Sequence, residues 1–333
     1  ARRGARTYLG ILIATSIGLQ LPAIIWTYLA TGTLDFVPGG TLTGNVQGVS
    51  VGILLALYMY GIGKAALMPI HRWLPAAMVA PTPVSALLHA VAVVKAGVFT
   101  VLKVIIYIFG LDLISAEPST QWLTWAAAIT LTLGSLIAMQ QDNLKKRLAY
   151  STIAQLSYVI LGASLGVAMG AVGGAMHIVM HAAGKITLFF CAGAVYVAHH
   201  KTEISDMRGL GRAMPVTFIC FFIGAISVIG LPPAGGAWSK TLLMIGSADA
   251  GQQIMIGVLI VSSLLNVAYL LPIPIRAFLS PPPGKEYTGI QEAPWPQVAA
   301  LSFTALLVIV LFFLANPIYE FLLPIADAAG GVK

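Results

Sequence analysis

Charged residues are scarce in this sequence. They make up 9% of its 333 residues, whereas a soluble domain typically carries about 25%. Because 58% of the residues are hydrophobic, most of the surface must face lipid, which excludes an ordinary water-soluble domain. The net charge of +7 does not indicate a nucleic-acid-binding protein, since the basic residues lie between apolar segments without interleaved aromatics. We predict a membrane protein in contact with the lipid bilayer, with no nucleic-acid partner.

Cysteine is also scarce, and the sequence contains only Cys191 and Cys220. Both fall inside apolar runs, so the sequence supports neither a disulfide framework nor a metal site of the CxxC type. The sequence also lacks a nucleophile elbow, a phosphate-binding loop and a cysteine ligand cluster. We therefore expect no cofactor and no metal.

Acidic residues are absent from the interior of every long apolar run. All eleven lie in predicted loops or at helix ends. Basic residues, by contrast, lie inside or beside these runs: Lys64, His71, Arg72, His89, Lys95, Lys103, His177, His181, Lys185 and Lys240. A charged lysine at mid-bilayer costs about 2.5–3.5 kcal/mol, and burial lowers the pKa of a lysine toward neutral pH. These bases therefore predict a proton path. Snorkelling from a helix end is the alternative, and we favour it for Lys103.

Apolar runs separated by glycine, proline and charge predict an all-α, polytopic membrane protein with about nine transmembrane helices. The predicted spans are residues 8–30, 49–79, 83–109, 121–141, 146–166, 170–198, 214–247, 252–279 and 295–323. We treat residues 1–333 as a single membrane domain.

Two of these spans are predicted to be broken helices. Span 49–79 contains Pro69, and span 214–247 contains several breaking residues: Gly230, Pro232, Pro233, Gly235 and Gly236. Proline removes a backbone donor and glycine loosens the turn, and such breaks occur at membrane depth only where protein or a wet cavity satisfies the freed groups. Each broken span carries one lysine, Lys64 or Lys240. Paired interrupted helices are typical of transporters built from repeats.

The loop charges predict one orientation. If the helices alternate, one side of the membrane receives Arg2, Arg3, Arg6, Lys145, Lys146, Arg147, Lys201, Arg208, Arg212, Arg276 and Lys285. The other side receives Lys333 alone. The positive-inside rule then places the amino terminus in the cytoplasm and the carboxyl terminus outside, in a bacterial cytoplasmic (inner) membrane.

A column of bases in span 170–198 is the sharpest local pattern. His177, His181 and Lys185 recur at i, i+4 and i+8, so they lie on one helical face about 6 Å apart. Because histidine titrates close to physiological pH, the column predicts a proton relay. The alternative is a set of polar residues satisfied at helix contacts. A metal site is disfavoured, since no carboxylate or thiolate completes a ligand set on this face.

Four stretches resemble the proton-translocating antiporter-like subunits of Mrp cation/proton antiporters and respiratory complex I. They are GKAALMPIHRWLPAAMVAPTPVSALLHAVAVVKAGVF from residue 63, DNLKKRLAYSTIAQLSYV from residue 142, HIVMHAAGKITLFFCAGAV from residue 177 and GLPPAGGAWSK from residue 230. The resemblance implies an inverted-repeat fold whose first repeat is incomplete, because the first several helices of the family have no counterpart. Residues 1–110 would be the rest of that repeat, 121–280 the second repeat, and 281–333 a C-terminal loop and helix.

The resemblance also implies roles for individual residues. Lys64 would store a proton in the first broken helix, Lys185 would be the central connecting lysine, and Lys240 would be the terminal lysine of the exit half-channel. His177 and His181 would be relay partners of Lys185. Further members of the proton path by family position are His89, Lys95 and Lys145, although charge patterning alone assigns Lys145 to a cytoplasmic loop. The family pairs the residue matching Lys64 with a glutamate, which span 8–30 lacks. We expect that carboxylate from a longer chain or a neighbouring subunit.

The expected function is a proton-translocating subunit of a multi-subunit cation/proton antiporter, most similar to the D-type subunit of Mrp antiporters. Its partners would be other membrane subunits of the same complex and protons, with a role for Na⁺ left open. One alternative is a proton-pumping antiporter-like subunit of complex I (NADH:quinone oxidoreductase) or of a related membrane hydrogenase. A stand-alone solute transporter is a weaker alternative. Redox chemistry would belong to partner subunits, so enzyme activity of this chain is left open.

Overall fold

The computed structural model describes residues 2–282, 287 and 289–328, without the side chains of Arg3 and residues 326–328. Two basic residues used to predict the topology, Lys285 and Lys333, lie outside the described residues. Within the described ranges every regular element is helical. The prediction of an all-α protein is therefore confirmed.

The helices follow one another across the bundle. Those of the first half are α1 (Arg2–Thr15), α2 (Leu21–Thr31), α3 (Val49–Gly61), α4 (Trp73–Ala76), α5 (Thr82–Ala86), α6 (Val93–Val104), α7 (Leu111–Ala116) and α8 (Trp122–Gln140). Those of the second half are α9 (Leu144–Ser164), α10 (Ala168–His199), α11 (Pro215–Ile229), α12 (Gly236–Asp249), α13 (Gln253–Leu270), α14 (Pro272–Leu279), α15 (Trp295–Phe313) and α16 (Ala315–Ala328). Short π-turns occur at Ser16–Gln20, Leu87–Val91 and Ile105–Phe109.

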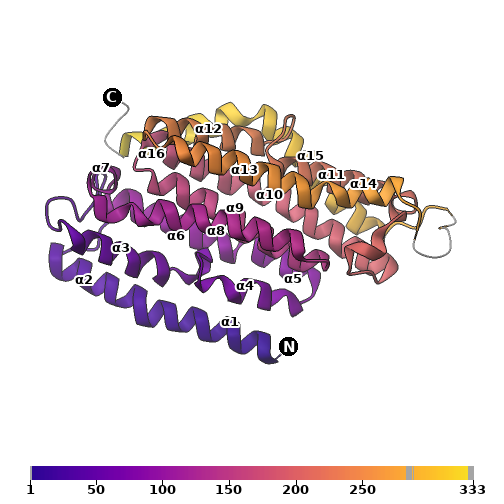
Figure 1. The fold of residues 1–333 in the computed structure, drawn as a ribbon, viewed down its shortest axis with the longest axis horizontal. Helices are drawn as coiled ribbons and strands as arrows, with labels where there is room; N and C mark the ends of the chain where they lie inside the picture. Colours follow the sequence, from indigo (N-terminus) through magenta and orange to yellow (C-terminus); the bar gives the residue numbers. More distant parts are fainter. Residues whose placement is uncertain (1, 283–286, 288, 329–333) are drawn as a thin grey trace.

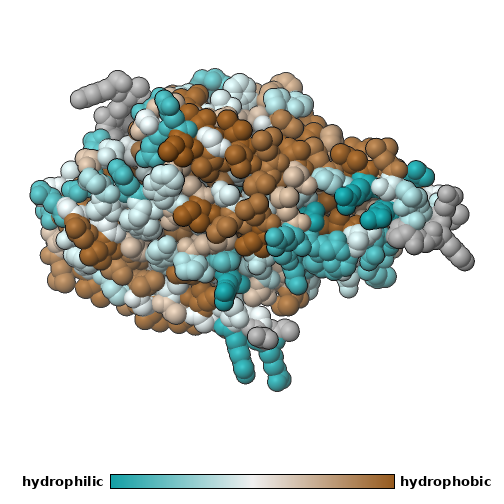
Figure 2. All heavy atoms as spheres, in the orientation of Figure 1, coloured by the Kyte–Doolittle hydropathy of each residue, from teal (hydrophilic) through white to brown (hydrophobic). Residues whose placement is uncertain are grey.

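The helices run along the long axis of the molecule, with α1 and α2 on one side and α12, α15 and α16 on the other (Figure 1). In the described part of the chain, six helices are long and apolar enough to cross a membrane. They are Gly4–Thr31, Thr82–Phe109, Pro118–Gln140, Ala168–His199, Gln253–Leu279 and Trp295–Phe313. Figure 2 shows hydrophobic side chains over much of the visible side, with hydrophilic ones gathered near the end where α5 and α14 lie. This distribution is the one a bilayer requires.

Both predicted breaks are present. In the first, α3 ends at Gly61, and the chain passes through short 3₁₀ turns and a cis Met68–Pro69 peptide before α4. The Trp73 indole donates to the Gly63 carbonyl at 2.8 Å, and the Met68 backbone N–H donates to the Thr130 hydroxyl at 3.2 Å. Neighbouring side chains thus satisfy the backbone groups that the break releases, as a low-dielectric interior requires.

The second break separates α11 from α12. Gly230 has a positive φ of 93°, a conformation that favours glycine, and the backbone N–H of Gly235 donates to the Val308 carbonyl at 3.2 Å. The carbonyl of Ile229, the last residue of α11, accepts a hydrogen bond from the side chain of Lys240 at 2.8 Å. A cation therefore caps the carboxyl end of a half-helix, where the helix dipole is negative.

One predicted span is wrong in its extent. Residues 295–323 are not one helix, because α15 ends at Phe313 and α16 starts at Ala315. Pro317 lies in the first turn of α16, where a missing backbone N–H costs nothing, but it could not continue α15. After the turn, α16 packs against α10.

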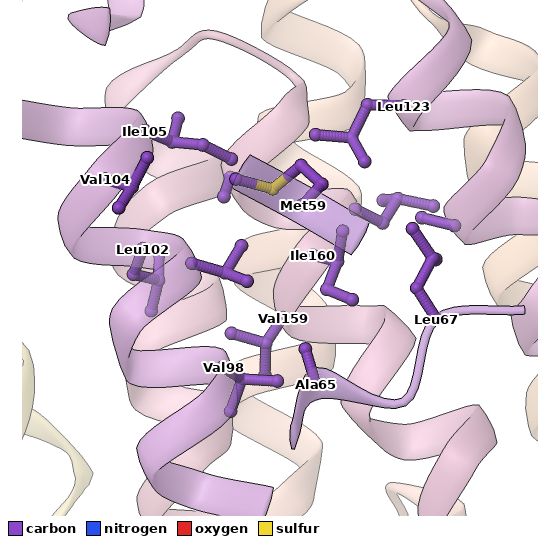
Figure 3. Close-up of a cluster of buried hydrophobic side chains, with 14 of the residues drawn as sticks. Met59, Ala65, Leu67, Val98, Leu102, Val104, Ile105, Leu123, Val159 and Ile160 are labelled. Carbon is purple, nitrogen blue, oxygen red and sulfur yellow. The ribbon is translucent and has the colours of Figure 1, made fainter. Parts of the chain in front are cut away.

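An apolar cluster joins the first broken helix to the centre of the bundle (Figure 3). Ala65, beside the break, packs with Val98 of α6 and Val159 of α9, and Met59 of α3 belongs to the same cluster. Burial of such side chains at about 25 cal/mol per Å² holds the interrupted segment against continuous helices, which offsets the loss of helical hydrogen bonds at the break.

The close approach of α6 to the break leads to a stability prediction. A Cβ on Gly97 would lie 2.5 Å from the backbone N of Ala65 and the backbone C of Lys64. We expect Gly97→Ala to lower the free energy of unfolding by about 1–3 kcal/mol through overpacking. Gly257→Ala is the matched control, since nothing lies within 4 Å of that Cβ. Thermal unfolding in detergent measures both, and equal stability of the two variants would contradict the tight packing.

Candidate proton-path site

The site is built around α10, the 32-residue helix from Ala168 to His199. Its amino-terminal half is rich in glycine and alanine, and small residues allow close helix packing in membranes. A Cβ on Gly173 would meet the backbone of α12 at 2.9 Å, and one on Gly174 would meet the Val159 carbonyl oxygen at 3.1 Å. The helices α9 and α12 therefore pack closely against α10 beside its polar face.

The predicted column on α10 is present and buried. His177, His181 and Lys185 are exposed by 1%, 2% and 0%, and the two imidazole rings stack with centroids 5.7 Å apart and planes at 11°. The spacing i, i+4 places one ring above the next.

Lys95 of α6 contacts this column directly. Its Nζ lies 2.5 Å from His181 Nδ1, and Lys95 is itself buried. Two nitrogens so close need one hydrogen between them, donated either by the lysine Nζ or by the imidazole Nδ1. A proton can therefore move between the two side chains without movement of either helix.

His177 is held on every side. Its Nε2 lies 3.1 Å from Gln155 Oε1, and its Nδ1 lies 2.9 Å from Ser239 Oγ. One face of the ring stacks on His181, and Tyr158 stacks on the ring at 5.2 Å. Because both edges and both faces have partners, the ring is fixed in orientation.

Lys240 occupies a site that suits an ammonium group. Its Nζ donates to the Ile229 carbonyl at 2.8 Å, to Ser263 Oγ at 3.1 Å and to the Tyr158 hydroxyl at 3.3 Å. It also lies 4.6 Å from the centroid of the Tyr158 ring. A lysine ammonium has three N–H donors, and here each finds an oxygen. Tyr158 contacts both Lys240 and His177, so it links the second break to the column.

Lys185 and His89 extend the row in the other direction. In the described part of the chain, Lys185 Nζ has one hydrogen-bond acceptor, the Leu148 carbonyl, at 3.2 Å. His89 lies in the π-turn Leu87–Val91 and is fully buried, and neither ring nitrogen has a hydrogen-bond partner among the residues that the structure describes. Its ring packs on Phe189 at 5.0 Å. Lys185 and Lys145 both lie close enough to act on His89 electrostatically.

Charge patterning alone placed Lys145 in a loop, and the structure shows that this placement is wrong. It lies in the first turn of α9, half-buried, and donates to the Ala80 carbonyl at 2.6 Å. Asn143 caps this helix, accepting from the backbone N–H of Lys146, so the chain becomes helical before the three basic residues rather than after them. Lys145 also lines a cavity of about 820 Å³, whose wall includes Phe189.

Lys64 lies apart from the row. Its side chain is exposed on this chain, whereas the next residue, Ala65, is buried in the apolar cluster. Lys103, for which snorkelling was expected, is half-buried, with its Nζ 4.1 Å from the ring centroid of Phe36.

No acidic residue is buried in the described part of the chain. The oxygens that face the buried bases come instead from carbonyls, hydroxyls and one amide. Within the same residues no group of three potential metal ligands occurs. The bases therefore cannot be neutralised by ion pairing inside the site, and each proton that enters raises the positive charge of the row.

Sequence reasoning missed four uncharged members of the site: Tyr158, Gln155, Ser239 and Ser263. Residue type gave little signal, because hydroxyl residues are common in membrane helices. Gln155 could have been noticed in the sequence, because it is the only amide side chain between Asn143 and Gln252.

The comparisons with known proteins show the family and the fold of the chain. Residues 2–266 match the family described as NADH:quinone oxidoreductase/Mrp antiporter, TM. The chain is 35% identical over 280 residues to NADH-quinone oxidoreductase subunit N of Desulforudis audaxviator, an alignment that covers 82% of this chain and 56% of the relative. It is 37% identical over 239 residues to NAD(P)H-quinone oxidoreductase chain 5 of a Synechocystis strain, covering 67% and 34%.

Solved structures share the fold. A chain of the Mrp complex from a Dietzia species superposes with a TM-score of 0.84 at 22% identity, over 98% of this chain and 67% of that one. A chain of respiratory complex I from Thermus thermophilus gives a TM-score of 0.76 at 25% identity, over 96% and 68%. The chain thus spans about a third to two thirds of the length of these proteins.

Proposed function

We propose that this chain, which belongs to the NADH:quinone oxidoreductase/Mrp antiporter membrane family, translocates protons as one subunit of a larger membrane complex. The observation that carries the proposal is the row of buried bases from His89 to Lys240, which contains no acid among the described residues. Burial of so many ionisable groups at membrane depth is costly, and a purely structural scaffold has no need of them. Reversible protonation is the chemistry that these groups share.

The geometry supports a route through the row. The cavity beside Lys145 offers protons from the basic end of the bundle, and Phe189 lies between that cavity and His89. From His89 the row continues to Lys185, to the Lys95–His181 pair, to His177, and through Tyr158 to Lys240. In this route Lys240 stores the proton, because its three donors are satisfied. Lys185 has a single acceptor and so releases a proton more readily.

The proposed role of Lys64 requires an acidic partner from outside the residues described. Its exposure on this chain fits a lysine that faces a carboxylate on a preceding segment of a longer chain or on a neighbouring subunit. An unpaired ammonium against lipid would be costly, and an acidic partner would remove that cost. In the same proposal, residues 1–110 form part of a first repeat and residues 121–280 form a second repeat.

Orientation and membrane follow from charge. The basic end of the bundle, with Lys145, Lys146 and Arg147, would face the cytoplasm by the positive-inside rule. The amino terminus would lie on the same side and the carboxyl terminus outside, in a bacterial inner membrane.

The names of the curated relatives bear on the choice of complex. Both relatives are named as parts of a quinone oxidoreductase, which supports a complex I-type assembly at least as well as the D-type Mrp antiporter protein that the motifs suggested. A complex of either kind would supply other membrane subunits as partners and its own driving force. If the complex is an antiporter, the movement of Na⁺ would be coupled to the movement of protons.

The test is proton movement by the assembled complex in proteoliposomes, followed with a pH-sensitive dye. Lys95→Met is expected to reduce the initial rate about tenfold or more, because loss of a positioned proton carrier commonly costs 10²–10⁴-fold, and His181 retains Lys185 as a second neighbour. Lys103→Met is the matched control, a lysine of the same helix that reaches Phe36 instead of the row. Equal rates in both variants would refute the proposed path.

A further inference from the structure

His177 lies in a site where no described acid is buried, so its hydrogen-bond partners decide whether its ring can hold an extra proton. The Ser239 hydroxyl has one hydrogen and two acceptors within reach, the Gly236 carbonyl at 3.1 Å and His177 Nδ1 at 2.9 Å. When the hydroxyl donates to Gly236, its oxygen is left to accept a hydrogen bond from His177 Nδ1. On the opposite edge, Gln155 presents its amide oxygen to Nε2 at 3.1 Å. With the Gln155 oxygen at Nε2 and the Ser239 oxygen at Nδ1, both ring nitrogens donate and the ring is an imidazolium; when the Ser239 hydroxyl donates to Nδ1 instead, the ring is neutral with its hydrogen on Nε2.

The remaining surroundings also favour a cation. The Tyr158 ring stacks on the imidazole at 5.2 Å, and an electron-rich aromatic face attracts positive charge. Four bases act on the site against this: Lys95, Lys240 and Lys185 on neighbouring positions, and His181 stacked below. The described residues place no acid within the buried site to oppose them. Only uncharged oxygens and the Tyr158 ring are therefore placed to stabilise a proton on His177.

Among the partners of His177, Gln155 is the one whose side chain can change its orientation. Its side chain is fully buried, and its Nε2 has no hydrogen-bond partner among the described residues. No second contact therefore locks the amide in one orientation. With the oxygen toward the ring the amide accepts from an imidazolium, and after a half-turn its NH₂ donates to the lone pair of a neutral imidazole. The ring itself cannot turn, since its faces are stacked on both sides.

We propose that Gln155 is a positioning residue that sets the charge state of His177, stabilising the imidazolium through its amide oxygen in the absence of any acid. This inference deepens the proposed function and rests on it for its role in transport. The hydrogen-bond claim itself concerns only the protonation of His177.

The experiment measures that protonation directly. The complex is labelled with ¹⁵N-histidine and studied in lipid by solid-state NMR at neutral pH, and subtraction of the His177→Asn spectrum isolates the His177 ring nitrogens. Gln155→Glu supplies a carboxylate in place of the amide, so the doubly protonated fraction is expected to rise. Gln155→Leu removes the acceptor, so that fraction is expected to fall. Gln155→Met replaces the leucine variant if that variant does not assemble.

Exposed Gln140, at the end of α8, supplies the matched controls. Gln140→Glu and Gln140→Leu are expected to leave the His177 signals unchanged. Opposite shifts in the two Gln155 variants support the inference, because a merely structural role would not change sign with the substituent. Unchanged signals, or shifts in the same direction, would overturn it.

Transport separates the two proposals. Both Gln155 variants are expected to lower proton flux roughly tenfold or more. Gln155→Glu would hold the proton on His177 too tightly, and Gln155→Leu would disfavour protonation of His177. Opposite NMR shifts with unchanged flux would leave Gln155 in control of His177 but would remove His177 from the proton path. If Lys95→Met still lowered the flux while the Gln155 variants left the His177 NMR signals unchanged, the proposed function would stand and this inference would be wrong.

Discussion

Proton translocation is expected to fall by about 10²-fold or more, to the limit of detection, when Lys185 is replaced by alanine. Lys185 is fully buried and lies one helical turn beyond His181 on α10. Its charge also acts on His89, at the other end of the row. A gap at this position therefore separates the two halves of the row, whereas loss of Lys95 leaves a second neighbour for His181. The measurement is dye-reported proton uptake by the reconstituted complex.

Lys103→Ala is the matched control for Lys185→Ala. Lys103 is a half-buried lysine of α6 whose Nζ lies over the Phe36 ring, and it takes no part in the row. We expect assembly and flux close to those of the unaltered complex. Both variants should assemble, because Lys185 forms only one hydrogen bond, at 3.2 Å. Full proton flux in an assembled Lys185→Ala complex would show that protons bypass α10.

Lys240→Met is expected to affect both stability and transport. Methionine has a similar length but no donor, so the Ile229 carbonyl, Ser263 and Tyr158 lose a shared partner. Unpaired buried polar groups cost about 1–3 kcal/mol each, and the carboxyl end of α11 loses its cap. We expect a lower unfolding temperature of the complex in detergent, together with a loss of proton flux of about 10²-fold.

Lys240→Arg separates the two effects. A guanidinium keeps the positive charge and the donors, but it does not release its proton in proteins. We expect the arginine variant to recover part of the thermal stability and none of the proton flux. If the arginine variant transported protons at the normal rate, Lys240 would be a structural cap at the second break and not a carrier.

Much of the architecture could be read from the sequence because the bilayer imposes simple requirements. A span needs about 20 apolar residues, and freed backbone groups need partners. Gly230, Pro232 and Pro233 therefore predicted the second break, and Pro69 the first, as the structure has them. The division of residues 295–323 into α15 and α16 was missed, because the turn is at the apolar Leu314 and the residues around it keep the mean hydropathy high. Hydropathy does not register a turn made of apolar residues.

The sequence by itself determined which groups had to be buried: bases without acids, three of them at helical spacing on α10. It could not decide which of them touch. Only the tertiary structure brought Lys95 to His181, set Tyr158 between His177 and Lys240, and left Lys64 outside the row. The physical reason is the range of the two kinds of constraint. The cost of burying a charge applies to each residue alone, whereas a hydrogen bond of about 3 Å depends on how separate helices pack.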